Sequence, residues 1–300
     1  MPELPDVVVY LEALEERIGG AVLENLELGS PFLLRSVEPP VSELIGRRVV
    51  GFARLGKRLV FEFEGELFSV LHLMIAGRLR WRQASQKGPA LRPMAIFTFS
   101  TGLLYLTEAG TRRRASLHLV RGREQLAAFD PGGLEVLEAN LAAFRATLQR
   151  ENHTLKRSLT DPHLFSGIGN AYSDEILHRA RLSPVKLTQK LTAEEVERLY
   201  QATRATLSEW VEKLRREAKE GFPEKVTAFR EDMAVHGRYR LPCPDCGTPV
   251  QRIRYAENET NYCPTCQTQG KLLADRSLSR LLRQDWPRTL EELEQRMRRT

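Results

Sequence analysis

Cysteine, aromatic residues and long hydrophobic runs are all scarce in this sequence of 300 residues, which has four cysteines and 7% aromatic residues. No apolar run approaches the ~20 residues that a membrane-spanning helix requires. The N-terminus, MPELPD, is acidic and lacks the basic-then-apolar order of a signal peptide. These absences exclude an integral membrane protein, and we expect a soluble protein of the cytoplasm.

Hydrophobic residues make up 42% of the chain and charged residues 28%, which excludes disorder as the main state. The length suits two compact domains and an accessory element. The net charge of +6 arises in the second half, because residues 1–140 hold 17 basic and 17 acidic residues while residues 141–300 hold 28 and 22. This excess of positive charge in the second half favours a polyanionic partner that binds to the C-terminal part. An ordinary solvated basic surface would have the same composition.

The hydrophobic periodicity changes along the chain and predicts an α+β fold. Apolar side chains recur at helical spacing over residues 3–18, and Gly19 and Gly20 provide the stop. Residues 22–106 contain short β-type runs broken by Gly, Pro and Ser, which predicts an antiparallel sandwich or barrel. After the DPGG breaker at residues 130–133, helical periodicity covers residues 139–150, 154–160, 170–180 and about 193–218.

The cysteines form two C-x-x-C pairs that are separated by sixteen residues: Cys243, Cys246, Cys263 and Cys266. In a cytosolic chain this spacing predicts a tetrahedral zinc site rather than disulfides. Four thiolates leave no coordination position for water, so we expect one structural Zn²⁺ that holds a short hairpin rigid. Within that hairpin Arg252 and Arg254 alternate onto one strand face, which suits phosphate contact if they are not simply solvent-facing.

Pro2 follows the initiator methionine, and Glu3 follows Pro2. Removal of Met1 would make Pro2 a secondary amine with a pKa of ~8, partly unprotonated at neutral pH. Such an amine can attack a sugar C1′ and form an iminium ion. The same proline could equally serve only to start the first helix, so this position alone does not decide the chemistry.

Four motifs occur in order along the chain: PELPD at residues 2–6, GKR at residues 56–58, SGIGNAYSDEILHRARLSP at residues 166–184, and the four-cysteine segment. Together they resemble the formamidopyrimidine-DNA glycosylase/endonuclease VIII family of base-excision repair enzymes. The resemblance covers roughly residues 2–267. It implies an N-terminal β-sandwich with a leading helix, a C-terminal helix–two-turns–helix domain and a four-cysteine zinc hairpin.

The resemblance implies roles for four residues. Pro2 falls on the family's nucleophilic proline, Glu3 on its catalytic glutamate and Lys57 on the lysine of its first-domain β turn. Asn170 falls on the asparagine that grips phosphate, where the preceding glycines and the helix N–H groups also suit an anion. The implied reaction displaces a damaged base at C1′ with Pro2, transfers protons through Glu3 and breaks the strand by elimination. It requires a kinked duplex and a flipped-out nucleotide.

Two DNA-inserting elements depart from the family pattern. In HLMIAG, Ile75 stands where many members have the methionine that fills the gap left by the flipped base, and Met74 precedes it. In TEAGTRRRAS, Arg113 and Arg114 retain the arginine probe, whereas Ala115 replaces an aromatic ring. The predicted apolar wedge therefore remains, and the stacking ring is lost.

The finger holds a third departure, because Asn258 replaces an arginine of the family pattern. A neutral amide neutralises phosphate less than a guanidinium does, and Arg252 or Arg254 could substitute for it. The three departures put in doubt the preference for 8-oxoguanine opposite cytosine more than the covalent chemistry.

Two weaker patterns allow alternative interpretations. Arginines alternate with Leu79 and Trp81, so one strand face is basic and suits either a DNA backbone or solvent: Arg78, Arg80 and Arg82. His72 sits in a hydrophobic strand and is interpreted as a core histidine rather than a base. The extension after residue 268 has helical texture over residues 271–284 and 289–299 and could bind phosphate, dock on the helical domain or bind a partner.

The residues and the resemblance together predict a bifunctional DNA glycosylase and AP lyase with one structural Zn²⁺, acting on damaged double-stranded DNA as a nucleoid-associated monomer. We expect four segments: a catalytic β-sandwich (1–130), a helix–two-turns–helix domain (131–225), a zinc finger (226–268) and a basic C-terminal extension (269–300). The alternative is a non-catalytic zinc-finger protein that binds damaged or bent DNA. Pro2, Glu3 and Lys57 favour the enzyme, because a pure binder has no need of them.

Overall fold

The computed structural model of the chain describes residues 1–110, 112–219, 221–224, 230–255, 258–273, 287–289, 291–292 and 295. The chain divides into two compact units: Met1–Gly133 with Ser208–Thr227, and Leu134–Leu207 with Ala228–Thr300. The first segment boundary expected from the sequence, at residue 130, lies three residues from the end of the first stretch. The expected segment 131–225 is shared between the two units, and the functional division into four segments remains a prediction.

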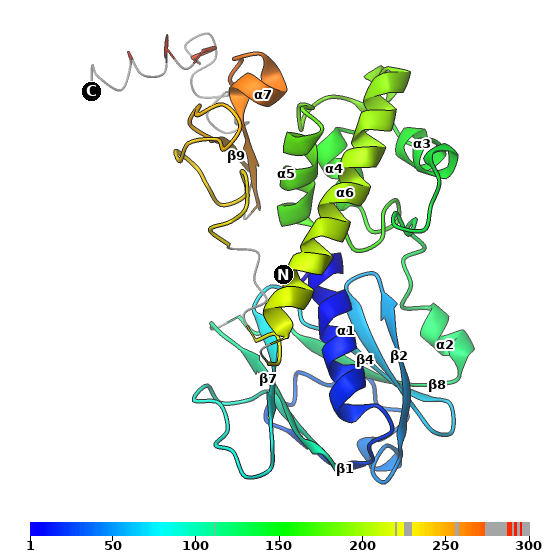
Figure 1. The fold of residues 1–300 in the computed structure, drawn as a ribbon. Helices are drawn as coiled ribbons and strands as arrows, with labels where there is room; N and C mark the ends of the chain where they lie inside the picture. The colour runs from blue at the N-terminus through cyan, green and yellow to red at the C-terminus, as the bar shows by residue number, and fades with distance from the viewer. Residues whose placement is uncertain are drawn as a thin grey trace. The chain divides into compact units, whose positions relative to one another are not determined.

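The first unit is a β-sandwich with a leading helix (Figure 1). Its two four-stranded sheets have the strand orders β1-β6-β7-β5 and β2-β3-β4-β8, and all their pairings are antiparallel. The elements are α1 (Leu4–Ile18), β1 (Leu23–Leu28), η1 (Val41–Glu43), β2 (Val49–Leu55), β3 (Arg58–Phe63), β4 (Leu67–His72), β5 (Gly77–Arg82), β6 (Ala95–Phe99), β7 (Gly102–Glu108), β8 (Ser116–Arg121) and α2 (Arg123–Ala127).

The core of this unit lies between the two sheets and against α1. Val7 and Leu14 of α1 are fully buried in the same hydrophobic cluster as Phe61 of β3 and Phe97 of β6. The rings of Phe61 and Phe97 come from different sheets and stack with their centroids 6.2 Å apart. The predicted leading helix and sandwich are therefore confirmed. The strand pattern extends beyond residue 106 to β8, because the arginine-rich loop only interrupts it.

The C-terminal part of α6 (Ala193–Ala218) and the connector after it belong to the first unit. Arg215 of α6 forms an ion pair with Glu12 of α1, with Nε 2.9 Å from Oε2. The ring of Phe222 lies 5.8 Å from that of Tyr10, centroid to centroid. The end of α6 is thus fastened to α1 by charge, and the connector by hydrophobic contact.

The second unit is mainly helical, with the cysteine segment as a separate hairpin element. Phe144 and Phe165 are fully buried, and their ring centroids lie 5.0 Å apart. The elements are α3 (Leu141–Gln149), α4 (Leu155–Thr160), α5 (Asn170–Arg179), η2 (Thr188–Lys190), α6, β9 (Gln251–Tyr255), β10 (Asn258–Tyr262) and α7 (Pro264–Thr268). The helices expected after residue 133 are confirmed to within two residues at each end. The helical texture expected over residues 271–284 and 289–299 lies largely outside the described residues.

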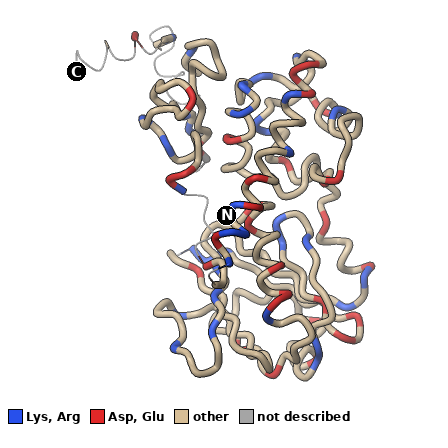
Figure 2. Tube along the Cα trace, in the orientation of Figure 1, with Lys and Arg blue, Asp and Glu red and all other residues tan. Residues whose placement is uncertain are grey.

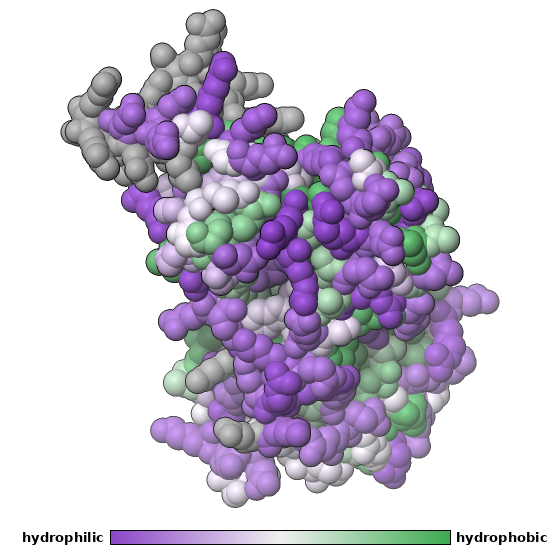
Figure 3. All heavy atoms as spheres, turned by 45° about the horizontal axis from the view of Figure 1, so that its top comes forward, coloured by the Kyte–Doolittle hydropathy of each residue, from purple (hydrophilic) through white to green (hydrophobic). Residues whose placement is uncertain are grey.

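Hydrophilic side chains predominate on the face drawn in Figure 3, and hydrophobic ones occupy separate small areas between them. The most exposed large hydrophobic side chains include Phe32 and Val37, both in the loop between β1 and η1. Among the described residues, none of the helices has the length and apolar character needed to cross a membrane.

Candidate functional site

Two buried acids lie at the start of α1, beside the N-terminus: Glu3 directly precedes the helix, and Asp6 is in its first turn. Glu3 and Asp6 are each 2% exposed, and the Glu3 backbone N–H donates to Asp6 Oδ2 at 2.7 Å. Burial raises the pKa of Asp6 to about 7, although that hydrogen bond acts in the opposite direction. The sequence did not single out Asp6, because an acid in the first turn ordinarily serves only the positive end of the helix dipole.

The N-terminal amine is partly buried, and in this structure it belongs to Met1. Burial lowers the pKa of the amine below its ordinary value; the Glu3 carboxylate opposes this shift, while Arg78 and Lys57 add to it. Lys57 lies in the turn between β2 and β3, Arg78 lies on β5, and Pro2 is buried at the start of α1. The structure therefore brings the three predicted catalytic residues to one end of the sandwich, and it adds Arg78 to them.

His72 lies at the end of β4, directly opposite Arg58 of β3 in the sheet register. Burial, together with the charges of Arg58 and Lys57, lowers the pKa of His72 to about 4. The ring is therefore neutral at neutral pH and can exchange hydrogen bonds without adding charge. The interpretation of His72 as a core histidine overlooked its closeness to the lysine turn, which arises only through the pairing of β3 with β4.

The HLMIAG segment forms a tight turn between β4 and β5. The Gly77 N–H donates to the Leu73 carbonyl at 2.9 Å, and a Cβ on Gly77 would lie only 2.3 Å from that oxygen. Met74 has a φ of 52°, and Ile75 is 53% exposed. The turn therefore presents an exposed apolar tip at the predicted wedge position.

The arginine-rich loop is anchored to β7 by the Glu108 carboxylate. This carboxylate accepts the backbone N–H groups of Arg114 and Ala115, each at 3.0 Å. Arg113 and Arg114 are exposed, whereas Ala115 is 1% exposed and belongs to the core. The position where the family pattern has an aromatic ring thus faces the interior in this protein.

Asn170 begins α5, directly after a glycine-containing turn in which Gly167 has a φ of 78°. The Asn170 side chain donates from Nδ2 to the backbone carbonyl of Glu259 in β10 at 2.8 Å. The Lys156 ammonium donates to the Asn170 carbonyl at 2.6 Å. The predicted phosphate-gripping residue is therefore fixed to the finger hairpin by its own side chain.

The two finger arginines face the same carboxylate. Arg252 Nη1 lies 3.2 Å and Arg254 Nε 3.4 Å from Glu259 Oε2. The Arg252 guanidinium also lies 4.0 Å from the centroid of the Tyr239 ring. The sequence reasoning missed Glu259, which holds both arginines on the common face that their alternation predicted.

The side chain of Asn258 lies outside the described part of the structure, although its backbone belongs to β10. Figure 2 shows Lys and Arg spread along both units and interspersed with Asp and Glu. Arg252 and Arg254 of the finger thus share an acidic neighbour, which a composition count could not reveal.

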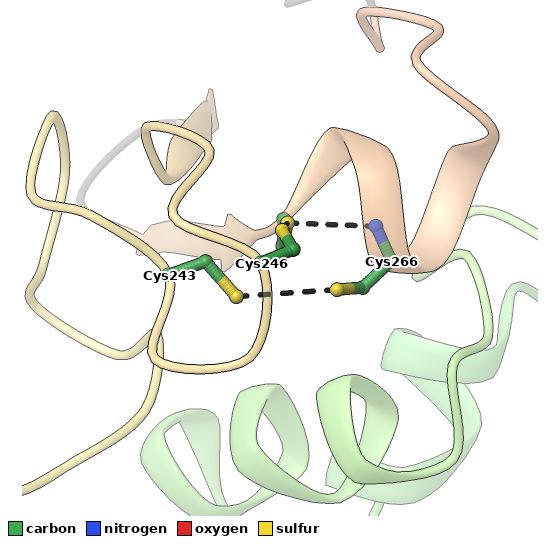
Figure 4. A group of neighbouring side chains, drawn as sticks. Cys243, Cys246 and Cys266 are labelled. Carbon is green, nitrogen blue, oxygen red and sulfur yellow. Dashed lines mark hydrogen bonds between the residues drawn. The ribbon is translucent and has the colours of Figure 1, made fainter.

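The four cysteines come together at one place in the second unit. Figure 4 labels three of them, Cys243, Cys246 and Cys266. The Sγ atoms of Cys243 and Cys266 are 4.0 Å apart, and those of Cys246 and Cys263 are 3.4 Å apart. A tetrahedral zinc with four bonds of ~2.3 Å spaces its sulfur atoms by about 3.8 Å, so the cluster fits the ion. Burial raises the pKa of Cys266 to about 12, which means that a dication is needed to keep it a thiolate at neutral pH. This is a structural zinc finger, as the cysteine spacing predicted.

The middle of α5 carries two buried acids that the sequence reasoning did not single out. Glu175 accepts the backbone N–H groups of Val235 and His236, each at 2.9 Å, in the chain that leads to Cys243. Asp174 Oδ2 lies 2.7 Å from His236 Nδ1, and the other oxygen of Asp174 lies 2.5 Å from the Lys156 ammonium. A pair of adjacent acids in the middle of the helix expected over residues 170–180 was the available signal.

Family models match three consecutive parts of the chain. The Formamidopyrimidine-DNA glycosylase N-terminal domain matches residues 1–117, the H2TH domain of the same enzymes matches residues 133–219, and the zinc finger found in FPG and IleRS matches residues 240–269. A curated relative, the formamidopyrimidine-DNA glycosylase of Thermus thermophilus, is 35% identical over 283 residues, which cover 90% of this chain and 100% of the relative.

Solved structures agree with these matches. The crystal structure of the MutM (Fpg) protein from Thermus thermophilus has a TM-score of 0.74 and 33% identity, and the match covers 89% of this chain and 98% of that one. The complex between the Lactococcus lactis Fpg and DNA containing an abasic site has a TM-score of 0.78 and 25% identity, with 89% and 99% coverage.

Proposed function

This chain belongs to the formamidopyrimidine-DNA glycosylase family, and from this premise we propose that it excises damaged bases with the Pro2 amine as its nucleophile. The enzyme is a DNA glycosylase with AP lyase activity, and its finger zinc is structural. The observation that supports the role of Pro2 is the state of the neighbouring terminal amine of Met1: burial and the charges of Arg78 and Lys57 lower its pKa, and Glu3 opposes this shift. An amine that is neutral at the working pH has the free electron pair that attack on C1′ requires.

In the proposed reaction the Pro2 nitrogen, exposed by removal of Met1, forms a bond to C1′ while the bond to the damaged base breaks. Glu3 then gives a proton to O4′ as the C1′–O4′ bond breaks, which opens the sugar and leaves an iminium ion between Pro2 and C1′. This ion makes the C2′ proton acidic. Loss of that proton expels the 3′ phosphate and breaks the strand. Lys57 holds a phosphate beside the sugar, where its charge stabilises the developing anion.

The remaining predicted residues are proposed to hold the duplex. Asn170 grips a phosphate near the lesion, and the apolar tip with Ile75 and Met74 enters the gap left by the flipped nucleotide. Arg113 and Arg114, which are exposed, reach toward the opposite strand. In the finger, Arg252, Arg254 and Asn258 are proposed to contact the DNA backbone.

The partner proposed for this chain is damaged double-stranded DNA, which we expect a single copy of the protein to bind within the nucleoid of the cytoplasm. Two solved relatives were crystallised with such a ligand, DNA containing an abasic site or Fapy-dG. Residues 1–130 are proposed to carry out the chemistry, and residues 131–268 to make most of the contacts with DNA. A non-catalytic damage-binding protein is not favoured, because it has no use for Pro2, Glu3 and Lys57 at one end of the sandwich.

The experiment that tests this function is borohydride trapping on a duplex that contains an abasic site. Reduction during the reaction should link the protein to DNA through residue 2, as mass spectrometry of the linked peptide would reveal. Pro2→Gly should lose most of the linked product, and Glu3→Gln should lose base excision while it still binds DNA. If the wild-type chain, with Met1 shown to be removed, bound this duplex but formed no link, the proposal would be wrong.

A further inference from the structure

His178 lies near the end of α5, on the face of the helix that contacts the zinc finger. The Nε2 atom of His178 lies 3.2 Å from the Sγ atom of Cys243, a zinc ligand. His178 is 4% exposed and Cys243 is 2% exposed, so the contact is shielded from water. The carboxylate of Asp245 is farther away, with Oδ2 4.0 Å from the same nitrogen. We propose that His178 is a positioning residue for the zinc site, which donates an N–H···S hydrogen bond to the zinc-bound thiolate of Cys243.

The direction of this hydrogen bond follows from the chemistry of the ligand. A thiolate bound to zinc has no proton, so it can only accept, and Nε2 of His178 must carry the hydrogen. The ring tautomer is thereby determined by the metal site. Hydrogen bonds from the surrounding protein to a metal ligand orient that ligand and affect how tightly the metal is bound.

The charge of the site supplies the reason for a donor at this position. Zn²⁺ with four thiolates carries a net charge of −2, and Cys243 and Cys263 hold part of it in a buried environment. The backbone N–H of Cys266 is directed at the Cys263 sulfur, at 3.5 Å. His178 provides the corresponding donor for Cys243, and it comes from outside the finger. Buried charge is costly without such donors, so loss of this one should loosen the metal.

The location of His178 on α5 gives the contact a second consequence. The same helix begins at Asn170, whose side chain donates to the backbone of Glu259 in the finger. The finger is therefore attached to α5 near both ends of the helix, and Glu175 holds the chain that leads into the finger between them. Zinc binding and the orientation of Asn170 are thus coupled through one rigid element.

The test compares zinc release from the wild-type chain, His178→Phe and His178→Gln, each loaded with one zinc, in the presence of an excess of a chromogenic chelator. His178→Phe keeps the ring and removes the donor, and it should release zinc about tenfold to a hundredfold faster. His178→Gln keeps an N–H at similar reach and should stay within about threefold of the wild type. His153→Phe, the same substitution elsewhere in the second unit, should release zinc at the wild-type rate.

The proposal is overturned if His178→Phe releases zinc at the wild-type rate, or if His178→Gln releases it as fast as His178→Phe, because packing alone would then explain the effect. A measurement on the wild-type chain covers the case in which His178→Phe does not fold. In cadmium-113-substituted protein, the His178 ring proton should show a scalar coupling to the metal nucleus through the sulfur. A His178 ring protonated on Nδ1 instead would overturn the assignment. Both readouts follow the metal and not base excision, so they are independent of the function proposed for Pro2.

Discussion

The pKa of Asp6 lies far above that of an ordinary aspartate. Its carboxyl group is 2% exposed and accepts the Glu3 backbone N–H, so it fixes the backbone that carries the proposed proton-transfer residue. Burial raises its pKa from 3.8 to about 7, which keeps it protonated over much of the acidic range. A protonated carboxyl can accept this hydrogen bond without placing a second negative charge beside Glu3.

Asp6 should make the folded state less stable as the pH rises. The unfolded carboxyl releases its proton near pH 3.8 and the folded one near pH 7, so between these values the folded state binds more protons. The free energy of unfolding therefore falls as the pH rises from 4 to 7, by at most about 1.4 kcal/mol per pH unit from this group. Asp6→Asn should remove this contribution, as urea midpoints measured from pH 4 to 8 would report. A wild-type and an Asp6→Asn curve that stay parallel would contradict the assignment, and Glu24→Gln, at an exposed site on β1, is the control.

At the scale of single elements, the alternating arginines of β5 are the clearest case in which the structure adds to the sequence. The alternation suited either a DNA backbone or solvent. Glu224 in the connector lies 2.7 Å from Arg80 through Oε2, and it also binds Arg82 through its other oxygen. Arg78 donates to the Gly77 carbonyl at 2.7 Å. The basic strand face is thus real, but two of its arginines hold the connector to the sandwich.

The double substitution Arg80→Gln with Arg82→Gln should affect stability more than DNA binding. We expect the free energy of unfolding to fall by about 1 kcal/mol, since a partly exposed carboxylate loses two cationic partners. The slope of log affinity against log salt concentration should stay unchanged. Each phosphate contact contributes about 0.9 to the size of that slope, and we expect neither arginine to make one. Lys57→Gln is the comparison, and its slope should be smaller by roughly one contact. A reduced slope in the arginine variant would instead assign β5 to the DNA interface.

The zinc hairpin is an element that cannot pack a core of its own. Cys263→Ala should abolish stoichiometric zinc and lower the affinity for abasic-site DNA by about tenfold or more, because a hairpin this short depends on the metal for its fold. Metal analysis and a binding titration check both effects. Thr265→Ala, at an exposed position of α7 beside the ligands, should retain the metal and the affinity. Unchanged fold and affinity in Cys263→Ala would show that the zinc is dispensable.

For the molecule as a whole, the three positions that depart from the family pattern are expected to change which lesions the enzyme removes. Ala115 is buried in the core of the sandwich, so the arginine loop has no aromatic ring at this position to stack on the orphaned strand. Stacking of an aromatic ring on a base contributes roughly 1–3 kcal/mol, which corresponds to about tenfold or more in binding. Ile75, at 53% exposure, retains the apolar wedge.

We therefore expect abasic sites and oxidised pyrimidines to be processed faster than 8-oxoguanine paired with cytosine. Single-turnover rates on a panel of duplexes, each with one lesion, measure the order directly, and an undamaged duplex of the same sequence is the control. A wide advantage for 8-oxoguanine opposite cytosine would show that the positions of Ile75, Ala115 and Asn258 do not determine the choice of lesion.

The sequence by itself determined the features that depend on local spacing. The helical period of residues 3–18, the β-type runs and the two C-x-x-C pairs each follow from neighbours along the chain, and the structure confirms all three. The motif order also predicted the family, because it lies in the residues themselves. These features rest on short-range geometry, so they need no knowledge of what packs against them.

Tertiary structure alone decided which groups meet. The closeness of Lys57 to the buried amine, the capture of Arg80 and Arg82 by Glu224, and the contact of His178 with Cys243 each join residues that are far apart in the sequence. Burial depends on the same folding, and it is burial that raises the pKa of Asp6 and lowers that of the terminal amine. Electrostatic and hydrogen-bond partners are chosen by distance in space, which a linear pattern does not contain.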